Sequence, residues 1–312
     1  MKTIVLANRV DGNGLTVLLN QLANFRDEQE VCLDFHKLCR VTPAGLVTMT
    51  AWVSDRNLRG LHTSLIRIQD CPIKEYLQRM NFATLCGIND MEERFQRHDS
   101  RKRFVPMIEI PRNTDELAIE LADLIAPGGD DFDNPNMGLW DAAQYVATEL
   151  TNNVRQHGRG KGFIAAQTTK ADGMVRIAVC DHGIGIRKSL SDGRNDLPDG
   201  ISHAESIVKA LDARISSKGQ PSNEGVGLTL TSHTVSSMNG QMLICSGNGV
   251  VITQQDGPPE IQDTLPRNGI SGTLITVVFK KSQAEAFNDR LHEAKEIKGL
   301  LQNASNSVNF LS

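Results

Sequence analysis

The sequence predicts an α/β protein with two domains. Short apolar runs typical of strands alternate with longer runs whose apolar residues recur every three or four positions, the spacing of one helix face. Two such series are separated by a charged stretch without an apolar stripe, and 312 residues suffice for two ordinary cores. We place residues 1–92 in a first domain, 93–103 in a linker, 104–281 in a second domain and 282–312 in a C-terminal tail.

The first domain is predicted from six segments that alternate between the two patterns. The strand-like segments are short and apolar, and the helix-like segments carry apolar residues at helical spacing. This order is typical of a buried sheet covered by helices. Strands are expected at 3–7, 31–35 and 65–68, and helices at 15–25, 44–58 and 73–82.

The second domain contains a long amphipathic helix, residues 139–157, which Gly158 and Gly160 terminate. Residues 186–224 are polar and rich in glycine, with one helical piece at 202–213, which is the profile of a mobile loop or lid. The other elements are expected as strands at 104–110, 163–169, 174–180, 241–246 and 273–279, and as helices starting at Thr114 and Gly225.

The tail carries apolar residues on one face of an expected helix. Such a helix either docks on the second domain or pairs with another chain, and we expect docking within the chain. The residues of this face are Phe287, Leu291, Ala294, Ile297 and Leu301.

The charge balance argues against two classes of partner. Lys and Arg number 33 against 37 Asp and Glu, a net charge of -4, and no long basic run is present. We therefore expect neither nucleic acid nor an anionic membrane surface as the main partner. No stretch approaches the ~18 apolar residues of a membrane span, and the N-terminal apolar run is too short for a secretory signal. A cytoplasmic location is expected.

Two kinds of site are not predicted. The six cysteines form no C-x-x-C pair and mostly lie beside apolar residues, so we expect buried free thiols and not a metal site or disulfides. No G-x-x-x-x-G-K-[ST] motif occurs in the chain, which excludes a P-loop mechanism.

Glu149 and Asn153 are candidate catalytic and metal-binding residues. They are four positions apart on the helix 139–157, so they lie about 40° apart at the edge of its apolar stripe. A carboxylate there can act as a general base, and an amide oxygen one turn later can hold a hard cation such as Mg²⁺. Taken alone, the pair is better explained by a solvated Glu and a helix-end Asn.

Asp181, Gly183 and Gly185 follow directly after an apolar strand. A carboxylate fixed at a strand end can accept a hydrogen bond from the amino group of an adenine. The two glycines permit positive φ angles and close approach of the backbone to a ligand. A tight turn would explain the same residues, because turns are rich in Asp and Gly.

A third motif, residues 225–228, lies at the start of an expected helix. The free N–H groups and the positive dipole end of such a helix favour phosphate. Thr273, preceded by Gly272, begins the last strand and supplies a small hydroxyl next to a backbone that must lie close to another group. The residues of the motif are Gly225, Val226, Gly227 and Leu228.

Together these motifs resemble the N box, G1 box, G2 box and final threonine of the GHKL, or Bergerat-fold, ATPases, over residues 104–281. The resemblance implies a two-layer α/β sandwich, with a mixed sheet, helices on one face and Mg-ATP between them. It implies Glu149 as base, Asn153 on the Mg²⁺, Asp181 on adenine and the glycine boxes around the phosphates. Lys218 in the lid either reaches the γ-phosphate or is solvated.

The first domain resembles a STAS domain, the anti-sigma-antagonist module, over about 90 residues that include 31–49 and 65–82. Residues 42–45, Thr-Pro-Ala-Gly, stand where that family has Asp-Ser-Ser-Gly. Ala44 therefore replaces the serine that is phosphorylated in such domains, and a serine phosphoswitch by that route is excluded. A plain α/β partner-binding domain is the alternative.

These resemblances favour a regulatory, Mg²⁺-dependent ATPase of the histidine-kinase-like or anti-sigma-kinase branch. ATP would order residues 186–224, hydrolysis would release them, and the first domain would bind a protein partner. The alternatives are a serine/threonine protein kinase acting on a separate partner and an ATP-gated interaction module without hydrolysis. A sensor histidine kinase is disfavoured because His98 lacks the paired helices that present a phosphoacceptor.

Chaperone and topoisomerase roles are also disfavoured, because no transducer or DNA-binding domain follows residue 281. The sequence leaves open whether the chain forms a homodimer.

Overall fold

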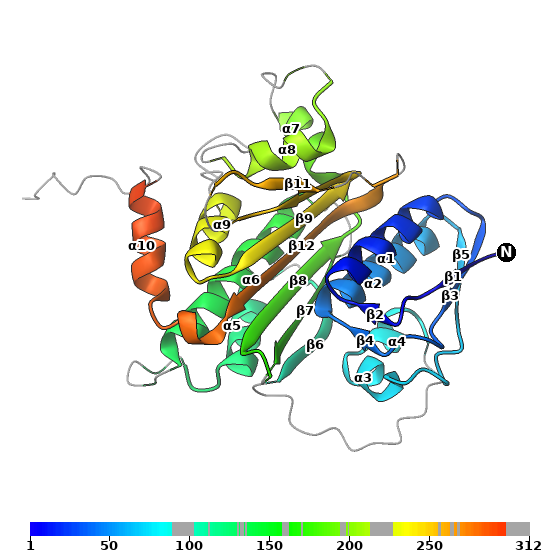
Figure 1. Ribbon diagram of the computed structural model, residues 1–312, viewed down its shortest axis with the longest axis horizontal. Coiled ribbons are helices and arrows are strands. Elements are labelled where there is room, and N and C mark those ends of the chain that lie inside the picture. Colours follow the sequence, from blue (N-terminus) through cyan, green and yellow to red (C-terminus); the bar gives the residue numbers. More distant parts are fainter. Residues whose placement is uncertain are drawn as a thin grey trace, which may run out of the picture.

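The protein consists of two α/β units that lie side by side in the computed structural model (Figure 1). The structure describes residues 1–88, 103–111, 113–129, 131, 134, 136–157, 162–169, 171–193, 198, 200–212, 227–254, 257–262, 265–266 and 269–297. The expected linker, 93–103, lies outside this description except for its last residue, so the proposed domain boundary stays a prediction.

The N-terminal unit has the expected alternation of strands and helices. Strands β1 (Lys2–Val5), β3 (Glu30–Asp34) and β5 (His62–Ile66) form a parallel sheet in the order β1-β3-β5. A second, two-residue pair joins β2 (Arg9–Val10) to β4 (Arg40–Val41). The helices are α1 (Asn13–Asn24), α2 (Pro43–Leu58), α3 (Lys74–Arg79) and α4 (Phe82–Leu85).

Two local features of this unit follow from single residues. Pro43 occupies the first turn of α2, where its missing N–H costs no helix hydrogen bond. The single helix expected at 73–82 is instead two helices, α3 and α4. Asn81, at φ +57°, separates them, because a left-handed residue cannot continue a right-handed helix.

The second unit is built on a seven-stranded sheet in the order β11-β10-β9-β12-β8-β7-β6. Every pair of neighbouring strands in it is antiparallel, so the expectation of a mixed sheet was wrong. Direct connections between β7 and β8 and between β9 and β10 alternate the strand direction. The strands are β6 (Phe104–Glu109), β7 (Gly162–Thr169), β8 (Met174–Asp181), β9 (Gln241–Gly247), β10 (Gly249–Ile252), β11 (Glu260–Gln262) and β12 (Ile270–Lys280).

The helices of this unit include one that the sequence patterns did not predict. In the stretch expected as a lid, residues 185–193 form α7 and residues 203–210 form α8, and Leu190 and Ile207 are buried. These parts of the stretch are packed helices; residues 213–224 lie outside the described part of the chain. The helices are α5 (Asp115–Ile125), α6 (Met137–His157), α7 (Gly185–Gly193), α8 (His203–Ala210), α9 (Gly227–Ser237) and α10 (Phe287–Ile297).

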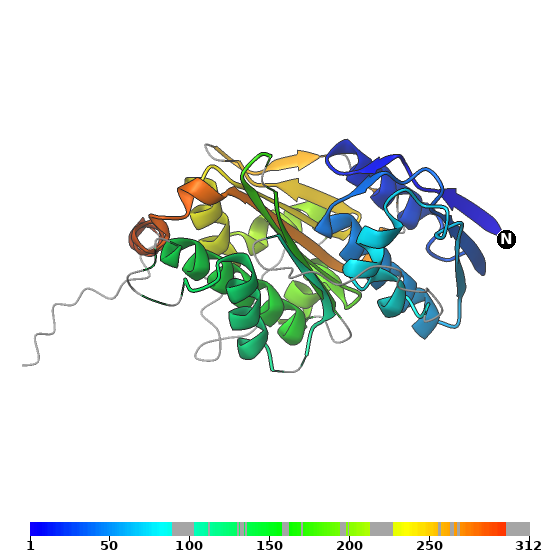
Figure 2. The same ribbon diagram turned by 90° about the horizontal axis from the view of Figure 1, so that it is seen from below.

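Both faces of the large sheet are buried, and alternate residues of β8 belong to two different cores. Ile177 and Val179 belong to a core shared with α5, α6 and α9, whereas Ala178 and Cys180 belong to a core shared with the N-terminal unit. Helix α2 lies along the second face (Figures 1 and 2). The unit's own helices thus cover one face, as the fold class predicts, and α2 covers the other.

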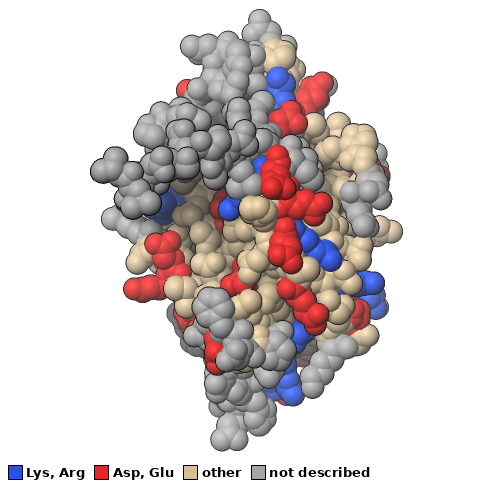
Figure 3. Space-filling view, turned by 90° about the vertical axis from the view of Figure 1, so that its left-hand side faces the viewer, with Lys and Arg blue, Asp and Glu red and all other residues tan. Residues whose placement is uncertain are grey.

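Helix α10 docks within the chain, as expected. Phe287 is buried and its ring centroid lies 5.7 Å from that of Tyr145 on α6, while Asn288 donates a hydrogen bond to Asp141 (2.6 Å). The face of the molecule on which α10 lies shows a band of acidic side chains (Figure 3), and the exposed residues of α10 include Asp289, Glu293 and Glu296. Leu301 of the expected apolar face lies outside the described residues.

The cysteines correct one expectation. All six are free thiols and Cys32, Cys71, Cys180 and Cys245 are buried, but Cys86 is half-buried and Cys39 is exposed. Cys39 lies in the loop between β3 and β4, where an apolar neighbour in the sequence does not imply burial. Within the part of the chain that is described, no helix is long and apolar enough to cross a membrane.

Candidate functional site

The carboxylate of Glu149 lies between α6 and the start of α9. The buried stripe of α6, which includes Val146 and Leu150, turns the neighbouring Glu149 toward α9. A Cβ on Gly227 would lie 1.9 Å from Glu149 Oε2, so the carboxylate rests directly against the glycine backbone. Burial raises the pKa of Glu149, and the charge of Lys295 on α10 opposes this rise.

Tyr145 joins the same two helices one turn before Glu149. Its hydroxyl is hydrogen-bonded to Thr231 of α9, and the Thr231 hydroxyl donates to the carbonyl of Gly227 (2.8 Å). The ring of Phe287 from α10 packs against Tyr145. These contacts hold α6, which carries Glu149, against the first turn of α9 and against α10.

The side-chain nitrogen of Asn153 is buried. This Nδ2 atom makes no hydrogen bond to any residue that the structure describes. A buried N–H donor without a partner is costly, so an acceptor atom of a bound ligand at this position would relieve it. The next residue, Val154, brings this turn of α6 to the end of β8, because Gly162 fits between Val154 and Asp181 without room for a side chain.

Asp181 ends β8 and is 6% exposed. Its carboxylate accepts hydrogen bonds from the backbone N–H of Gly183 (2.7 Å) and from that of Thr273. Burial outweighs these two bonds and raises the pKa of Asp181 to about 7. The carboxylate is thus an acceptor held in place by backbone groups from two segments.

Ser246, at the end of β9, holds these segments together. Its hydroxyl accepts from the N–H of Ile186 (2.9 Å), donates to the carbonyl of Gly272 (3.0 Å) and lies 3.3 Å from the Thr273 hydroxyl. Gly185 has φ +76° and packs against Ser246. The predicted Asp181, Gly183, Gly185 and Thr273 are therefore brought into one cluster.

The phosphate side of the predicted site is described only in part. Gly227 and the half-buried Leu228 open α9, whose first-turn N–H groups are free of helix partners by geometry. Lys218, Gly225 and Val226 lie outside the described residues. Of the predicted residues that are described, Glu149 meets Gly227 directly, and Asn153 adjoins Asp181 through Val154 and Gly162.

No cluster of three or more His, Cys, Asp or Glu side chains suited to a metal ion occurs among the described residues. A cation here would need Asn153 together with oxygens from a bound ligand. This donor set suits Mg²⁺, which is commonly held by one or two protein oxygens, substrate phosphates and water. With Oδ1 on the cation, the unpartnered Nδ2 of Asn153 would donate to an oxygen of the bound ligand, so the residue fits a magnesium–nucleotide complex.

The comparison with known families agrees with this geometry. Residues 138–282 match the family model HATPase_c, described as histidine kinase-, DNA gyrase B- and HSP90-like ATPase. This part of the chain is a GHKL-type ATPase domain. The HATPase_c match begins in α6 and ends just after β12, so it includes every predicted site residue. Strand β6 and helix α5 precede the matched residues but share their sheet and core. No curated protein matches the chain significantly.

HATPase_c domains bind ATP, so ATP binding is the activity that the assignment supports. Sequence reasoning missed Tyr145 and Ser246 in this domain and Lys295 on α10, which follows it. Ser246 could have been suspected, since a serine that ends an apolar strand needs a hydrogen-bond partner when buried. The other two gave no local signal, because their roles depend on the packing of α10 and α9 against α6.

Proposed function

We propose that this protein is a regulatory Mg²⁺-dependent ATPase in which Glu149 is the general base. The observation that carries the proposal is the placement of the Glu149 carboxylate against Gly227, at the end of a helix whose N–H groups favour phosphate. A base must lie within hydrogen-bond reach of the water that it activates, beside the phosphate under attack. The HATPase_c match supports the coarser part of the proposal, an ATP-binding role of the ATPase or kinase type.

The other site residues would bind and orient the nucleotide. Asp181 would accept the adenine amino group, and Gly183 and Gly185 would let the backbone approach the ligand closely. Gly227 and Leu228, with Gly225, Val226 and Lys218, would bind the phosphates. Asn153 would hold Mg²⁺, which would neutralise charge on the phosphate oxygens. The Thr273 hydroxyl, beside Ser246, would border the adenine.

The protonation state of Glu149 suits this role. Burial raises the pKa of the carboxyl, which makes its ionised form a stronger base. The opposing charge of Lys295 favours the ionised form. Glu149 would take a proton from water as the water oxygen attacks the γ-phosphate.

We further propose that the N-terminal unit is a STAS-like module for a protein partner. The burial of Ala44 at the start of α2 agrees with the absence of a phosphoswitch there. ATP would order the stretch between α8 and α9, and its hydrolysis would change the affinity for the partner. This coupling is what would make the ATPase regulatory.

The test is ATP turnover by the purified chain with Mg²⁺, with nucleotide binding recorded in the same samples. Glu149→Ala should keep ATP binding and lose turnover, whereas Asp181→Ala should lose binding. Equal turnover in Glu149→Ala and the unaltered chain would remove Glu149 from the mechanism. Failure of the unaltered chain to bind ATP would refute the proposal as a whole.

The same geometry would serve a serine/threonine kinase if the nucleophile were a protein hydroxyl. Glu149 would then take the proton of that hydroxyl instead of a proton of water. Tight ATP binding without phosphate release, together with transfer of label from ATP to a protein, would show that the protein is a kinase and not an ATPase. Tight binding with neither reaction would indicate an ATP-gated interaction module.

A further inference from the structure

Helix α2 packs on the sheet of the ATPase domain through one face. Its residues from 43 to 53, with Asp55 and Arg56, are buried, and the helix contacts β7, β8 and β12 of that sheet. Thr48, Ala51, Trp52 and Asp55 are spaced three and four residues apart, so they share the face turned toward β8 and β12.

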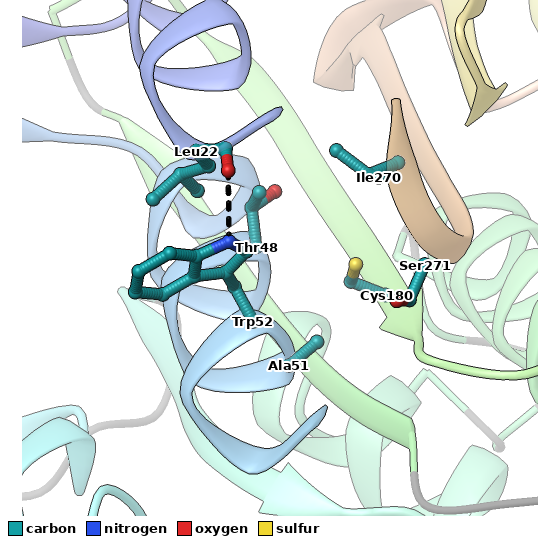
Figure 4. Close-up of a pocket in the computed structure, with 7 residues that line it drawn as sticks. All are labelled: Leu22, Thr48, Ala51, Trp52, Cys180, Ile270 and Ser271. Carbon is teal, nitrogen blue, oxygen red and sulfur yellow. Dashed lines mark hydrogen bonds between the residues drawn. The ribbon is translucent and has the colours of Figure 1, made fainter. Parts of the chain in front are cut away.

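This face closes over a small apolar pocket between the two units (Figure 4). Trp52 lines the α2 side of the pocket and donates its indole N–H to the carbonyl of Leu22 (3.0 Å), which ties α2 to α1. Cys180 and Ser271 line the opposite wall. These two residues are next to Asp181 and Gly272 in the chain, so the wall of the pocket is also the back of the candidate adenine site.

Two polar contacts connect α2 to that wall. Ser271 donates its hydroxyl to Asp55 Oδ2 (2.7 Å), and the Ser54 hydroxyl lies 3.4 Å from Nε2 of His182. Asp55 is 9% exposed, so its hydrogen bond with Ser271 is shielded from water. His182 follows Asp181, and Ser271 precedes Gly272 and Thr273.

Helix α2 contacts one segment at His182 and another at Ser271. Their neighbours Asp181 and Gly272 lie against each other without a gap. A Cβ on Gly272 would lie 2.3 Å from the carbonyl oxygen of Asp181 and 2.4 Å from its Oδ1. The strand pairing is irregular at this point, between Ile270 and Thr273, and Gly272 has φ +68°. A shift of Ser271 therefore moves Gly272 and the Thr273 N–H that binds the Asp181 carboxylate.

We propose that Asp55 of α2 is a positioning residue of the ATP site, which acts through Ser271 to hold the segment 271–273 against Asp181. This inference rests on the proposed function, because it assigns the adenine contact to Asp181. It extends that function by making the N-terminal unit a part of the nucleotide site. Because such coupling is reciprocal, ATP must in turn stabilise the contact of α2 with the sheet.

The experiment measures the affinity of the full-length chain for ATP and for GTP by calorimetry, with thermal unfolding of each variant. GTP lacks the amino group that Asp181 would bind. Ser271→Ala and Asp55→Ala should each weaken ATP binding about tenfold, as expected for one hydrogen bond, and leave GTP binding unchanged. The double variant should be no weaker than either single variant.

Two further variants separate positioning from general destabilisation. Asp55→Asn keeps an oxygen that can accept from Ser271, so it should bind ATP like the unaltered chain. Asp27→Ala removes a carboxylate that pairs with Arg59 as Asp55 does, and it should also leave ATP affinity unchanged.

The outcomes distinguish this inference from the proposed function. Normal ATP affinity in folded Ser271→Ala would overturn the inference alone, and so would an equal loss of ATP and GTP affinity. Absence of ATP binding by the unaltered chain would overturn both. Addition of ATP should also slow hydrogen exchange in α2, and unchanged exchange in an ATP-saturated chain would count against the reciprocal coupling.

Discussion

The Glu149 carboxylate leaves no room for a side chain at residue 227. A Cβ on Gly227 would lie 1.9 Å from Oε2 and 3.0 Å from the carboxyl carbon of Glu149. Gly227 is not among the glycines with positive φ, so its backbone angles alone would admit other residues. A side chain at residue 227 would therefore displace the Glu149 carboxylate, although the backbone conformation itself would admit it.

Gly227→Ala should therefore displace the carboxylate. An alanine in a helix is ordinarily more stable than a glycine by roughly 0.5–1 kcal/mol, but here the clash should reverse that gain and lower ATP turnover. Turnover and thermal unfolding of the variant test this. In Glu149→Ala/Gly227→Ala the clash is absent, so the thermal stability should return while turnover stays lost. A Gly227→Ala protein with unaltered turnover would show that the carboxylate can move at no cost.

Lys295 should set the acid limb of the pH–rate profile. It lies on the inward face of α10, next to the buried Ala294, and its charge lowers the pKa that burial has raised at Glu149. Removal of that charge by Lys295→Met should raise the pKa of Glu149. As the pH is lowered, kcat/KM of the variant should therefore begin to fall at a higher pH than that of the unaltered chain. Lys280→Met, an exposed lysine at the end of β12, is the matched control and should leave the profile in place.

An unchanged acid limb in Lys295→Met would mean that the limb belongs to a group other than Glu149. A limb that moves to lower pH would contradict the assigned sign. The profile of kcat/KM is the suitable one, because it reports the groups of the free enzyme.

Asp181→Asn should remove the pH dependence of the free energy of unfolding that the buried Asp181 carboxyl causes. The pKa of Asp181 is raised from 3.8 to about 7, so between these values the folded state holds a proton that the unfolded state releases. The unfolding free energy therefore falls as the pH rises through this window, by about 4 kcal/mol at most. Asn does not titrate, so the stability of Asp181→Asn relative to the unaltered chain should increase from pH 5 to pH 8 in denaturant titrations.

Asp172→Asn is the control of opposite sign. A hydrogen bond from Arg176 holds the pKa of the exposed Asp172 below its usual range, so its stabilisation is present at neutral pH and is lost as the pH falls. The relative stability of that variant should not increase from pH 5 to pH 8. The same slope in both variants would show that the Asp181 carboxyl is not the source of the effect.

The sequence predicts most of this fold because its apolar patterns are local. Strands β7 and β8 and helix α6 were expected within two residues of their observed bounds, since their apolar residues recur at the period of the element. Helix α7 was missed because residues 185–193 are largely polar, and only Leu190 and Ser189 of it are buried among the residues whose burial is described.

The site was predictable where its residues form a motif, and not where it depends on packing between distant segments. Glu149, Asp181 and Gly227 each lie in a short recognisable segment. Asp55 and Ser271 are 216 positions apart, and neither lies in a motif that implies their contact. The antiparallel order of the sheet is also non-local, since it depends on β12 inserting between β8 and β9.

Phe287 provides a test of how α10 supports the site. Its buried ring packs on Tyr145, whose hydroxyl is bound to Thr231 of α9. Phe287→Ala should cost roughly 3–5 kcal/mol of unfolding free energy, as for other buried aromatic residues, and Phe287→Leu should cost less. Denaturant titrations measure both, and Ile119→Ala, a half-exposed position on α5, should change stability little.

The same substitution should also act on the chemistry. Phe287 begins α10 and Lys295 lies in its last turn, so loss of the ring would loosen the docking of the whole helix and weaken the field that favours ionised Glu149. The acid limb of kcat/KM for Phe287→Ala should then move in the same direction as for Lys295→Met, while Phe287→Leu should keep it. A strong loss of stability with an unmoved acid limb would show that α10 supports the core of the ATPase domain without setting the charge of its base.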